Sequence, residues 1–246
     1  MISGQESPGP LIRDEQGFDA KDGGEVRGIL FIGGTVPSSS LIQRILRPDD
    51  FVCAADSGLD ASLEAGVRPA LVLGDMDSLS NRALLNDFPA ESVETHPVDK
   101  DESDTEIGIR RLVEIGCEDY VLIGGGEGRL DHILALRSLF DGDRPPSLWY
   151  TAREEIRMLE GKFIVWGKMG MRVSYFPVGG ASWSLSSSGL QWELDTLDWG
   201  AGSFSLSNRL KGERAEIDIR SGRLIQIRPV EDVLDMIDSR TVRSGG

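Results

Sequence analysis

Residues 70–78 read Ala-Leu-Val-Leu-Gly-Asp-Met-Asp-Ser, and this stretch decides the fold. The apolar run 70–73 is short, which is typical of a buried strand in a parallel sheet, and two aspartates follow it closely. A similar order, an apolar run followed by an acidic residue or a glycine loop, recurs at 51–56 and 120–131. We therefore expect several strands to bring acidic side chains to the carboxyl edge of one sheet, where open α/β folds bind ligands.

Strand and helix patterns alternate through the first half of the chain. Ser103 and Glu106 have the spacing of a capping box, which predicts the start of a helix. Right-handed crossovers between such elements would make the sheet mostly parallel and Rossmann-like. Strands are expected at 28–32, 51–55, 70–73, 120–123 and 147–151, and helices at 41–46, 59–64, 104–115 and 130–140.

The second half has a different period, with short alternating runs separated by glycine-bearing turns, which predicts an antiparallel β-sandwich. Ser221-Gly222 is expected to form a hairpin turn between the last two strands. The expected strands are 163–166, 171–178, 182–185, 190–194, 204–208, 215–220 and 223–228. The expected segments are a flexible acidic tail (1–26), an α/β domain (27–155), a β-sandwich domain (156–232) and a C-terminal tail (233–246).

Composition narrows the class of ligand. The 246 residues include 41 acidic and 26 basic ones, a formal charge of -15, so nucleic acid and anionic membrane surfaces would be repelled. No apolar run approaches the roughly 20 residues of a membrane span, and the first residues lack a signal-peptide pattern. The two cysteines show no metal-site spacing. We expect a cytoplasmic protein that acts on small molecules.

The acidic residues after the strands predict a metal site. Asp75 and Asp77 are two residues apart in a loop, so both can face one cation, and such hard oxygen ligands suit Mg²⁺. Taken alone, the pair could equally be a turn that caps the next helix. Further carboxylates expected at the same edge would repel one another unless a cation lies between them. They are Asp56, Asp101, Asp104 and Asp131.

Residues 124–129, Gly-Gly-Gly-Glu-Gly-Arg, offer backbone amides and a guanidinium to a phosphate. A Walker A sequence is absent, and Arg129 stands where the dinucleotide-binding fingerprint requires glycine. P-loop kinases and ordinary Rossmann dehydrogenases are therefore disfavoured. His132 either contacts phosphate or makes a structural hydrogen bond.

Taken in order, these residues resemble the thiamine pyrophosphokinase (thiamine diphosphokinase) family, over a match from Gly28 to about Ile227. Ser57 and Ser103 depart from it, because glycine and threonine are more usual there. The motifs that carry the resemblance are Ala55-Asp56-Ser57-Gly58, Gly74-Asp75-Met76-Asp77-Ser78, Lys100-Asp101-Glu102-Ser103-Asp104, Gly128-Arg129-Leu130-Asp131-His132, Ser188-Gly189-Leu190 and Ser207-Asn208.

The resemblance implies a reaction. The hydroxyl of thiamine attacks the β-phosphorus of ATP, AMP leaves and thiamine diphosphate forms, which requires alignment and charge neutralisation more than covalent catalysis. The α/β domain would bind Mg²⁺ and ATP. The β-sandwich would contact thiamine, and a homodimer interface would form the thiamine site.

The resemblance also implies residue roles. Asp75, Asp77 and Asp104 would bind the metal, and either Asp75 or Asp104 would accept the hydroxyl proton. Asp56 and Asp131 would complete the catalytic set, directly or through water. Residues expected to bind ATP or its phosphates are Gly33, Lys100, Asp101, Arg129 and His132. Residues expected to bind the aminopyrimidine of thiamine are Ser207 and Asn208.

Two alternatives stay open at this point. The first is a diphosphokinase for another hydroxymethyl heteroaromatic compound, such as a pterin, because the ATP-binding residues could be shared. The second is a nucleotide-binding or metal-binding module without turnover. Release of AMP in the presence of thiamine would distinguish all three.

Overall fold

The computed structural model describes residues 26–99, 101–180 and 182–233. These residues divide into two compact units: the α/β unit, 26–158 with 227–233, and the β unit, 159–226. Lys100, expected to bind phosphate, lies outside the described residues, as do the expected tails apart from Val26 and Val233. Among the helices of the described ranges, none is long and apolar enough to cross a membrane.

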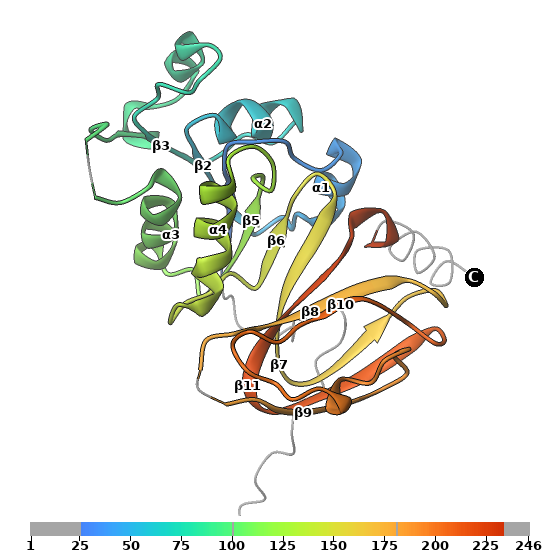
Figure 1. The fold of residues 1–246 in the computed structure, drawn as a ribbon. Coiled ribbons are helices and arrows are strands. Elements are labelled where there is room, and N and C mark those ends of the chain that lie inside the picture. Colours follow the sequence, from blue (N-terminus) through green and yellow to red (C-terminus); the bar gives the residue numbers. More distant parts are fainter. Residues whose placement is uncertain (1–25, 100, 181, 234–246) are drawn as a thin grey trace, which may run out of the picture. The chain divides into compact units, whose positions relative to one another are not determined.

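A parallel sheet forms the centre of the α/β unit (Figure 1). Its strands pair in the order β6-β5-β1-β2-β3-β4, all in parallel, which confirms the expected sheet. The sequence did not predict β4, because three residues carry too little apolar pattern. The strands are β1 (Arg27–Phe31), β2 (Phe51–Ala55), β3 (Leu71–Gly74), β4 (Val93–Thr95), β5 (Asp119–Ile123) and β6 (Leu148–Tyr150).

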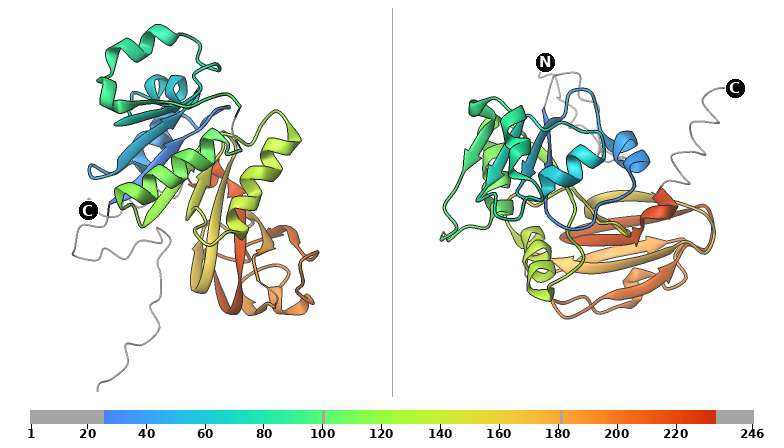
Figure 2. Two further views of the ribbon diagram at one scale, coloured as in Figure 1. Left: turned by 90° about the vertical axis from the view of Figure 1, so that its left-hand side faces the viewer. Right: turned by 90° about the horizontal axis from the view of Figure 1, so that it is seen from above.

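Helices cover both faces of this sheet. Figures 1 and 2 show α1 and α2 on one face and α3 and α4 on the other. The predicted capping box opens α3, where the Ser103 and Glu106 side chains each accept a hydrogen bond from the other's backbone N–H. The helices are α1 (Ser39–Ile45), α2 (Gly58–Glu64), α3 (Asp104–Ile115) and α4 (Leu130–Ser138), with short 3₁₀ turns η1 (Arg82–Asp87), η2 (Ala90–Ser92) and η3 (Leu139–Asp141).

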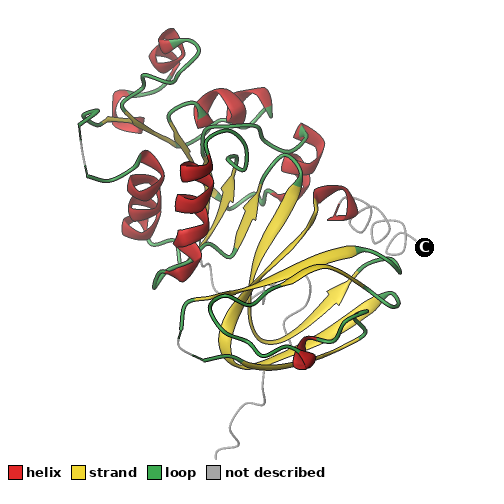
Figure 3. Cartoon of the chain, viewed as in Figure 1, coloured by secondary structure: helices red, strands yellow, loops and turns green. Residues whose placement is uncertain are grey.

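The β unit consists mainly of strands (Figure 3). They pair in the order β10-β8-β11-β7, and β9 pairs with β11 off this path. Trp183 and Trp199 pack against its core of buried aliphatic and aromatic side chains. Residues of β7 and β11 belong to both units. The elements are β7 (Glu154–Trp166), β8 (Arg172–Val178), β9 (Ser184–Ser188), η4 (Leu194–Thr196), β10 (Ser205–Arg209) and β11 (Arg214–Pro229).

Two expectations about the β unit are wrong. Ser221-Gly222 is not a hairpin turn, because β11 runs through both residues. Gly222 has φ +83°, and the pairing with β9 shifts register between Ile219 and Ser221. The turn-like sequence therefore corresponds to a local irregularity within the strand. Residues 190–194 form only an isolated bridge, from Leu190 to Leu210, followed by η4.

Candidate active site

The loops after β1, β2, β3 and β5 meet at the carboxyl edge of the parallel sheet. Backbone hydrogen bonds join them: the Gly125 N–H donates to the Gly33 oxygen over 2.9 Å, and the Asp56 N–H donates to the Leu73 oxygen over 2.9 Å. His96, after β4, donates its N–H to the Gly74 oxygen over 2.9 Å. Backbone bonds therefore join the loop after β1 to the glycine loop after β5, and the segments after β2 and β4 to β3.

Asp56 has an unusual backbone. Its φ is +46°, a left-handed conformation that costs a non-glycine residue free energy and is found mainly where the surroundings enforce it. The Met76 N–H donates to Asp56 Oδ1 over 3.1 Å. A Cβ on Gly74 would lie 2.0 Å from the same oxygen, so glycine is required at this position. The structure thus aims the Asp56 carboxylate at the loop that carries Asp75 and Asp77.

Asp104, the first residue of α3, lies beside Asp56. Burial raises the pKa of Asp56 to about 7, the hydrogen bond with Asp104 adds to this, and the Asp104 and Asp75 charges raise it further. Two carboxyl groups that share a hydrogen bond must hold a proton between them. A cation bound nearby would favour the charged form of Asp56.

The donor atoms suit Mg²⁺, but the side chains are not assembled around one point. Within the described ranges, no group of three metal-ligating side chains lies together. Asp77 Oδ1 accepts a hydrogen bond from Arg82 over 2.8 Å, and Asp75 Oδ1 accepts one from the Asp77 N–H over 2.9 Å. The chemistry fits a magnesium site, because every candidate ligand is a carboxylate and Asp56 is destabilised as an anion.

Arg129 and Asp131 pair with each other. Arg129 Nε donates to Asp131 Oδ1 over 3.1 Å, and this bonding holds the pKa of Asp131 below its usual range. Both side chains are mostly exposed, at 74% and 60%. His132 is also exposed and donates its N–H to Asp131 Oδ1 over 3.1 Å. These residues are accessible to a ligand, and Asp101 is exposed as well.

The glycine loop after β5 lies close against the sheet. A Cβ on Gly124 would lie 2.3 Å from the Ile32 oxygen, and one on Gly126 would lie 2.4 Å from a Thr151 methyl carbon. Trp149 Nε1 donates to the Gly124 oxygen over 2.7 Å. The absence of side chains here leaves backbone amides near the edge, as a phosphate-binding loop requires.

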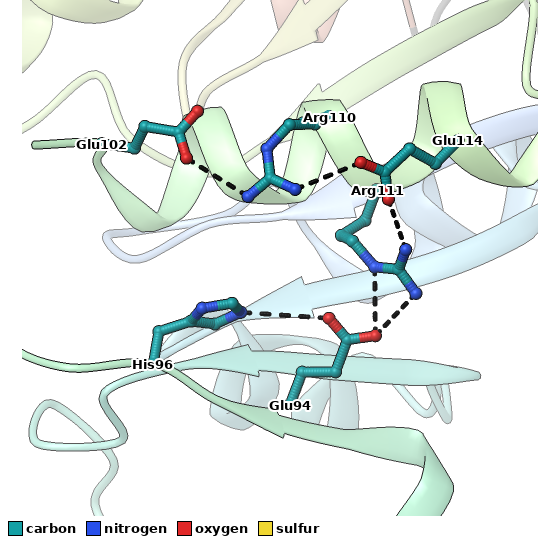
Figure 4. A network of polar contacts seen from close by, with 6 residues as sticks. All are labelled: Glu94, His96, Glu102, Arg110, Arg111 and Glu114. Atoms are coloured by element: carbon teal, nitrogen blue, oxygen red, sulfur yellow. Dashed lines mark hydrogen bonds and ion pairs between the residues drawn. The ribbon is translucent and has the colours of Figure 1, made fainter. Parts of the chain in front are cut away.

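Glu94 joins β4 to α3 in a network that sequence reasoning missed (Figure 4). Its Oε1 accepts two hydrogen bonds from Arg111, over 3.0 and 2.7 Å, and Arg111 also pairs with Glu114. His96 Nε2 lies 3.9 Å from Glu94 Oε2. The network anchors α3, whose first residue is Asp104. The charged residues of α3 are visible in the sequence, but they do not indicate which residue of β4 they contact.

In the β unit, the two residues expected to bind thiamine differ in environment. Ser207 is exposed and has φ +56°, a strained conformation. Asn208 is fully buried, and its amide is fully used. The amide nitrogen donates to the Trp192 oxygen and to Ser205, and the amide oxygen accepts from the Trp192 and Arg209 N–H groups. Direct reading of a pyrimidine by Asn208 would require one of these bonds to break, so the geometry favours an indirect role.

Family profiles match both halves of the chain. Residues 42–141 match the thiamin pyrophosphokinase catalytic domain, and residues 162–224 match the thiamin pyrophosphokinase vitamin B1 binding domain. Together they cover more than half of the sequence, in the order catalytic, then vitamin B1 binding. The chain belongs to the thiamin pyrophosphokinase family.

Solved thiamin pyrophosphokinases share its fold. The enzyme from Geobacillus thermodenitrificans is 25% identical with a TM-score of 0.64, over 83% of this chain and 97% of that one. The Bacillus subtilis enzyme is 20% identical with a TM-score of 0.67, over 83% and 98%. The yeast enzyme is 17% identical with a TM-score of 0.65, over 92% and 94%. No curated protein matches the sequence significantly.

Membership in this family identifies the chain as an enzyme, a thiamine diphosphokinase. It confirms the resemblance drawn from the acidic motifs and from Ser207-Asn208. The two alternatives, a pterin diphosphokinase and a module without turnover, are not favoured, because the second profile describes a vitamin B1 binding domain.

Proposed function

We propose that the chain transfers the pyrophosphoryl group of ATP to the hydroxyl of thiamine, giving thiamine diphosphate and AMP. The observation that supports this most strongly is the pairing of a catalytic-domain match with a vitamin B1 domain match in one chain. We assign ATP and Mg²⁺ binding to the domain predicted at 27–155 and thiamine binding to the domain predicted at 156–232. The two buried, free cysteines are compatible with the cytoplasmic location that we propose.

We assign Mg²⁺ binding to Asp75, Asp77 and Asp104, whose oxygens are the donors that this cation prefers. When bound, the cation supplies charge neutralisation at the phosphates of ATP. Asp56 holds the Met76 N–H and the Asp104 carboxyl, so it keeps the acidic loop facing the start of α3. Its raised pKa reflects crowding that a bound cation would relieve.

The phosphates need donors besides the cation. We assign this task to the amides of the glycine loop, with Gly33 beside them, and to Arg129, whose guanidinium can bind two phosphate oxygens at once. When Arg129 binds phosphate, its bonds to Asp131 would break, and the Asp131 carboxylate would become available beside the phosphates. His132, exposed one residue further on, can donate to phosphate. Lys100 and Asp101, neighbours in the sequence, complete the proposed ATP contacts.

Asp104 is our choice for the group that accepts the hydroxyl proton of thiamine. It is the first residue of α3 and shares a hydrogen bond with Asp56, so its carboxyl group is held at the acidic edge. Asp75 is the other candidate, and its Oδ1 already accepts the Asp77 N–H.

An acceptor assay tests the function directly. Purified chain with Mg²⁺ and ATP is supplied in turn with thiamine, thiamine monophosphate and a hydroxymethylpterin, and AMP is measured. We expect AMP release only with thiamine, because thiamine monophosphate has no free hydroxyl. AMP release with the pterin alone, or with no acceptor, would refute the assignment.

Asn208→Ala should weaken thiamine binding without affecting ATP. The buried amide bonds to the backbone N–H and to the backbone oxygen of Trp192. Its loss should loosen the backbone at Trp192 and at position 208, next to Ser207. Loss of one buried hydrogen-bonding group costs about 1 to 3 kcal/mol of stability. The same free energy sets an upper limit of roughly 5- to 150-fold on the rise in the Kd for thiamine. Calorimetric titration with thiamine and with Mg²⁺-ATP measures both effects, and the exposed amide variant Gln191→Ala serves as the control. Unchanged thiamine binding in Asn208→Ala would remove this residue from the acceptor site.

We further propose a homodimer that buries an apolar patch of the β unit. Trp192, Phe204 and Leu206 are each more than half exposed. Phe204 directly precedes β10 and Leu206 lies within it, and β10 is the strand at the end of the pairing order. Apolar side chains exposed on or beside an edge strand favour pairing with a second chain. Light scattering should therefore show a dimer at assay concentrations, and Leu206→Lys should shift it toward monomer. A fully active wild-type monomer would contradict the proposal.

A further inference from the structure

Arg82, a residue to which the sequence patterns give no role, contacts the whole acidic loop after β3. Its Nη2 donates to the backbone carbonyl oxygen of Asp75 over 2.9 Å and to the carboxylate Oδ1 of Asp77 over 2.8 Å. Its Nε donates to the backbone carbonyl oxygen of Met76 over 3.0 Å. One planar guanidinium thus bonds to three consecutive residues. A fork of this kind fixes direction as well as distance.

Met76, between the two aspartates, carries the strain of this loop. Its φ is +63°, a conformation that a long L side chain rarely adopts, and its side chain is buried. Its N–H donates to Asp56 and its oxygen accepts from Arg82, so both polar groups of the residue are fixed. Because Met76 turns the chain between Asp75 and Asp77, its conformation sets the directions of both carboxylates.

Arg82 is itself held in place by the segment before it. Ser80 donates through its N–H and its hydroxyl to the two oxygens of Asp60, over 2.9 and 2.8 Å, and Asp60 lies on α2. The Asn81 side chain caps η1 by accepting the Ala83 N–H over 3.0 Å. The backbone of Arg82 is therefore anchored to α2, although its side chain is 61% exposed.

We propose that Arg82 is a positioning residue for the pyrophosphoryl transfer: it fixes the loop that carries Asp75 and Asp77, so that both carboxylates stay at the edge where the metal-nucleotide complex is proposed to bind. This inference rests on the proposed role of these aspartates. The proposed role is indirect. Arg82 acts on the carbonyl groups of the strained loop and on the Asp77 carboxylate, and in doing so it places a positive charge beside the acidic edge.

Amide hydrogen exchange of the unliganded protein tests the contact independently of activity. In Arg82→Ala, exchange across residues 74–79 should be faster by about tenfold, because the loop loses three hydrogen bonds. Arg82→Lys keeps the charge but lacks the fork, so its exchange should lie closer to Arg82→Ala than to wild type. Arg214→Ala removes a similarly exposed arginine, which pairs with Glu216, and should leave this segment unchanged.

Turnover tests the consequence. Arg82→Ala should lower kcat and raise the Mg²⁺ concentration for half-maximal rate, by about 10- to 100-fold in total, the usual effect of losing a partner that orients a metal ligand. The KM for thiamine should change by less than about threefold, since Arg82 makes no acceptor contact. An unchanged exchange rate, an unchanged kcat despite faster exchange, or full recovery by Arg82→Lys would each overturn the proposal. An inactive wild-type chain would instead contradict the proposed function and leave the exchange result interpretable.

Discussion

Asp75→Asn and Asp77→Asn should each lower turnover by about 100-fold or more while the protein stays folded. Each substitution keeps the shape of the side chain but removes a negative charge where magnesium and the phosphates of ATP are proposed to bind. The Asp77 side chain is 60% exposed and Asp75 is half-buried, and asparagine keeps an oxygen that can accept the Asp77 N–H at position 75. The measurement is the rate of AMP release across a range of Mg²⁺ concentrations.

The control for these variants is Asp143→Asn, which removes the same charge from an exposed loop away from the carboxyl edge. Its rate should match wild type within about twofold, since isolated surface charges contribute little. Thermal unfolding of all three variants separates loss of function from loss of fold. Near-normal rates in Asp75→Asn and Asp77→Asn at limiting magnesium would exclude these residues as metal ligands.

Glu155→Gln should destabilise the α/β unit strongly. Glu155 is fully buried and accepts hydrogen bonds from Arg228 over 2.8 Å, Arg157 over 3.3 Å and the Tyr150 hydroxyl over 2.9 Å. Loss of the charge leaves two buried guanidinium groups without their shared carboxylate. Breaking a buried ion pair in this way costs about 3 to 5 kcal/mol, which lowers Tm by roughly 6 to 20 °C in a protein of this size.

The effect should depend on pH. Burial by itself would raise the pKa of Glu155, but the charges of Arg157 and Arg228 outweigh burial and lower the pKa from 4.5 to about 2. A lowered pKa stabilises the folded state fully above the unfolded value, and this stability is lost as the pH falls from about 4.5 toward 2. The difference in Tm between wild type and Glu155→Gln should therefore be largest above about pH 5 and shrink below it. A constant difference would contradict this explanation, and Glu216→Gln, from an exposed pair, is the control.

The α/β alternation and the acidic edge were predictable from sequence because each depends on local signals. Buried strands are short apolar runs, and the residues after them must lie at the carboxyl edge of a parallel sheet. The capping box of Ser103 and Glu106 likewise depends on a three-residue spacing. These local signals carry the resemblance to the thiamine pyrophosphokinase family.

Features that depend on distant or irregular contacts were not predictable. Ser221-Gly222 has the composition of a turn, yet tertiary pairing keeps β11 continuous through it. Arg82 binds backbone carbonyls, which leave no pattern in the sequence. The burial of Asn208 and its bonds to Trp192 also become visible only when residues 16 positions apart are placed together.

We propose that the carboxyl edge of the parallel sheet binds a divalent cation together with the nucleotide. A crystal structure with Mn²⁺ in place of Mg²⁺ and a non-hydrolysable ATP analogue tests it most directly, because anomalous scattering locates the cation without reference to the protein. We expect an anomalous peak bonded, directly or through one water, to Asp75, Asp77 or Asp104, with the triphosphate beside the glycine loop 124–128. A cation and nucleotide bound elsewhere, with these carboxylates still in their present contacts, would contradict it.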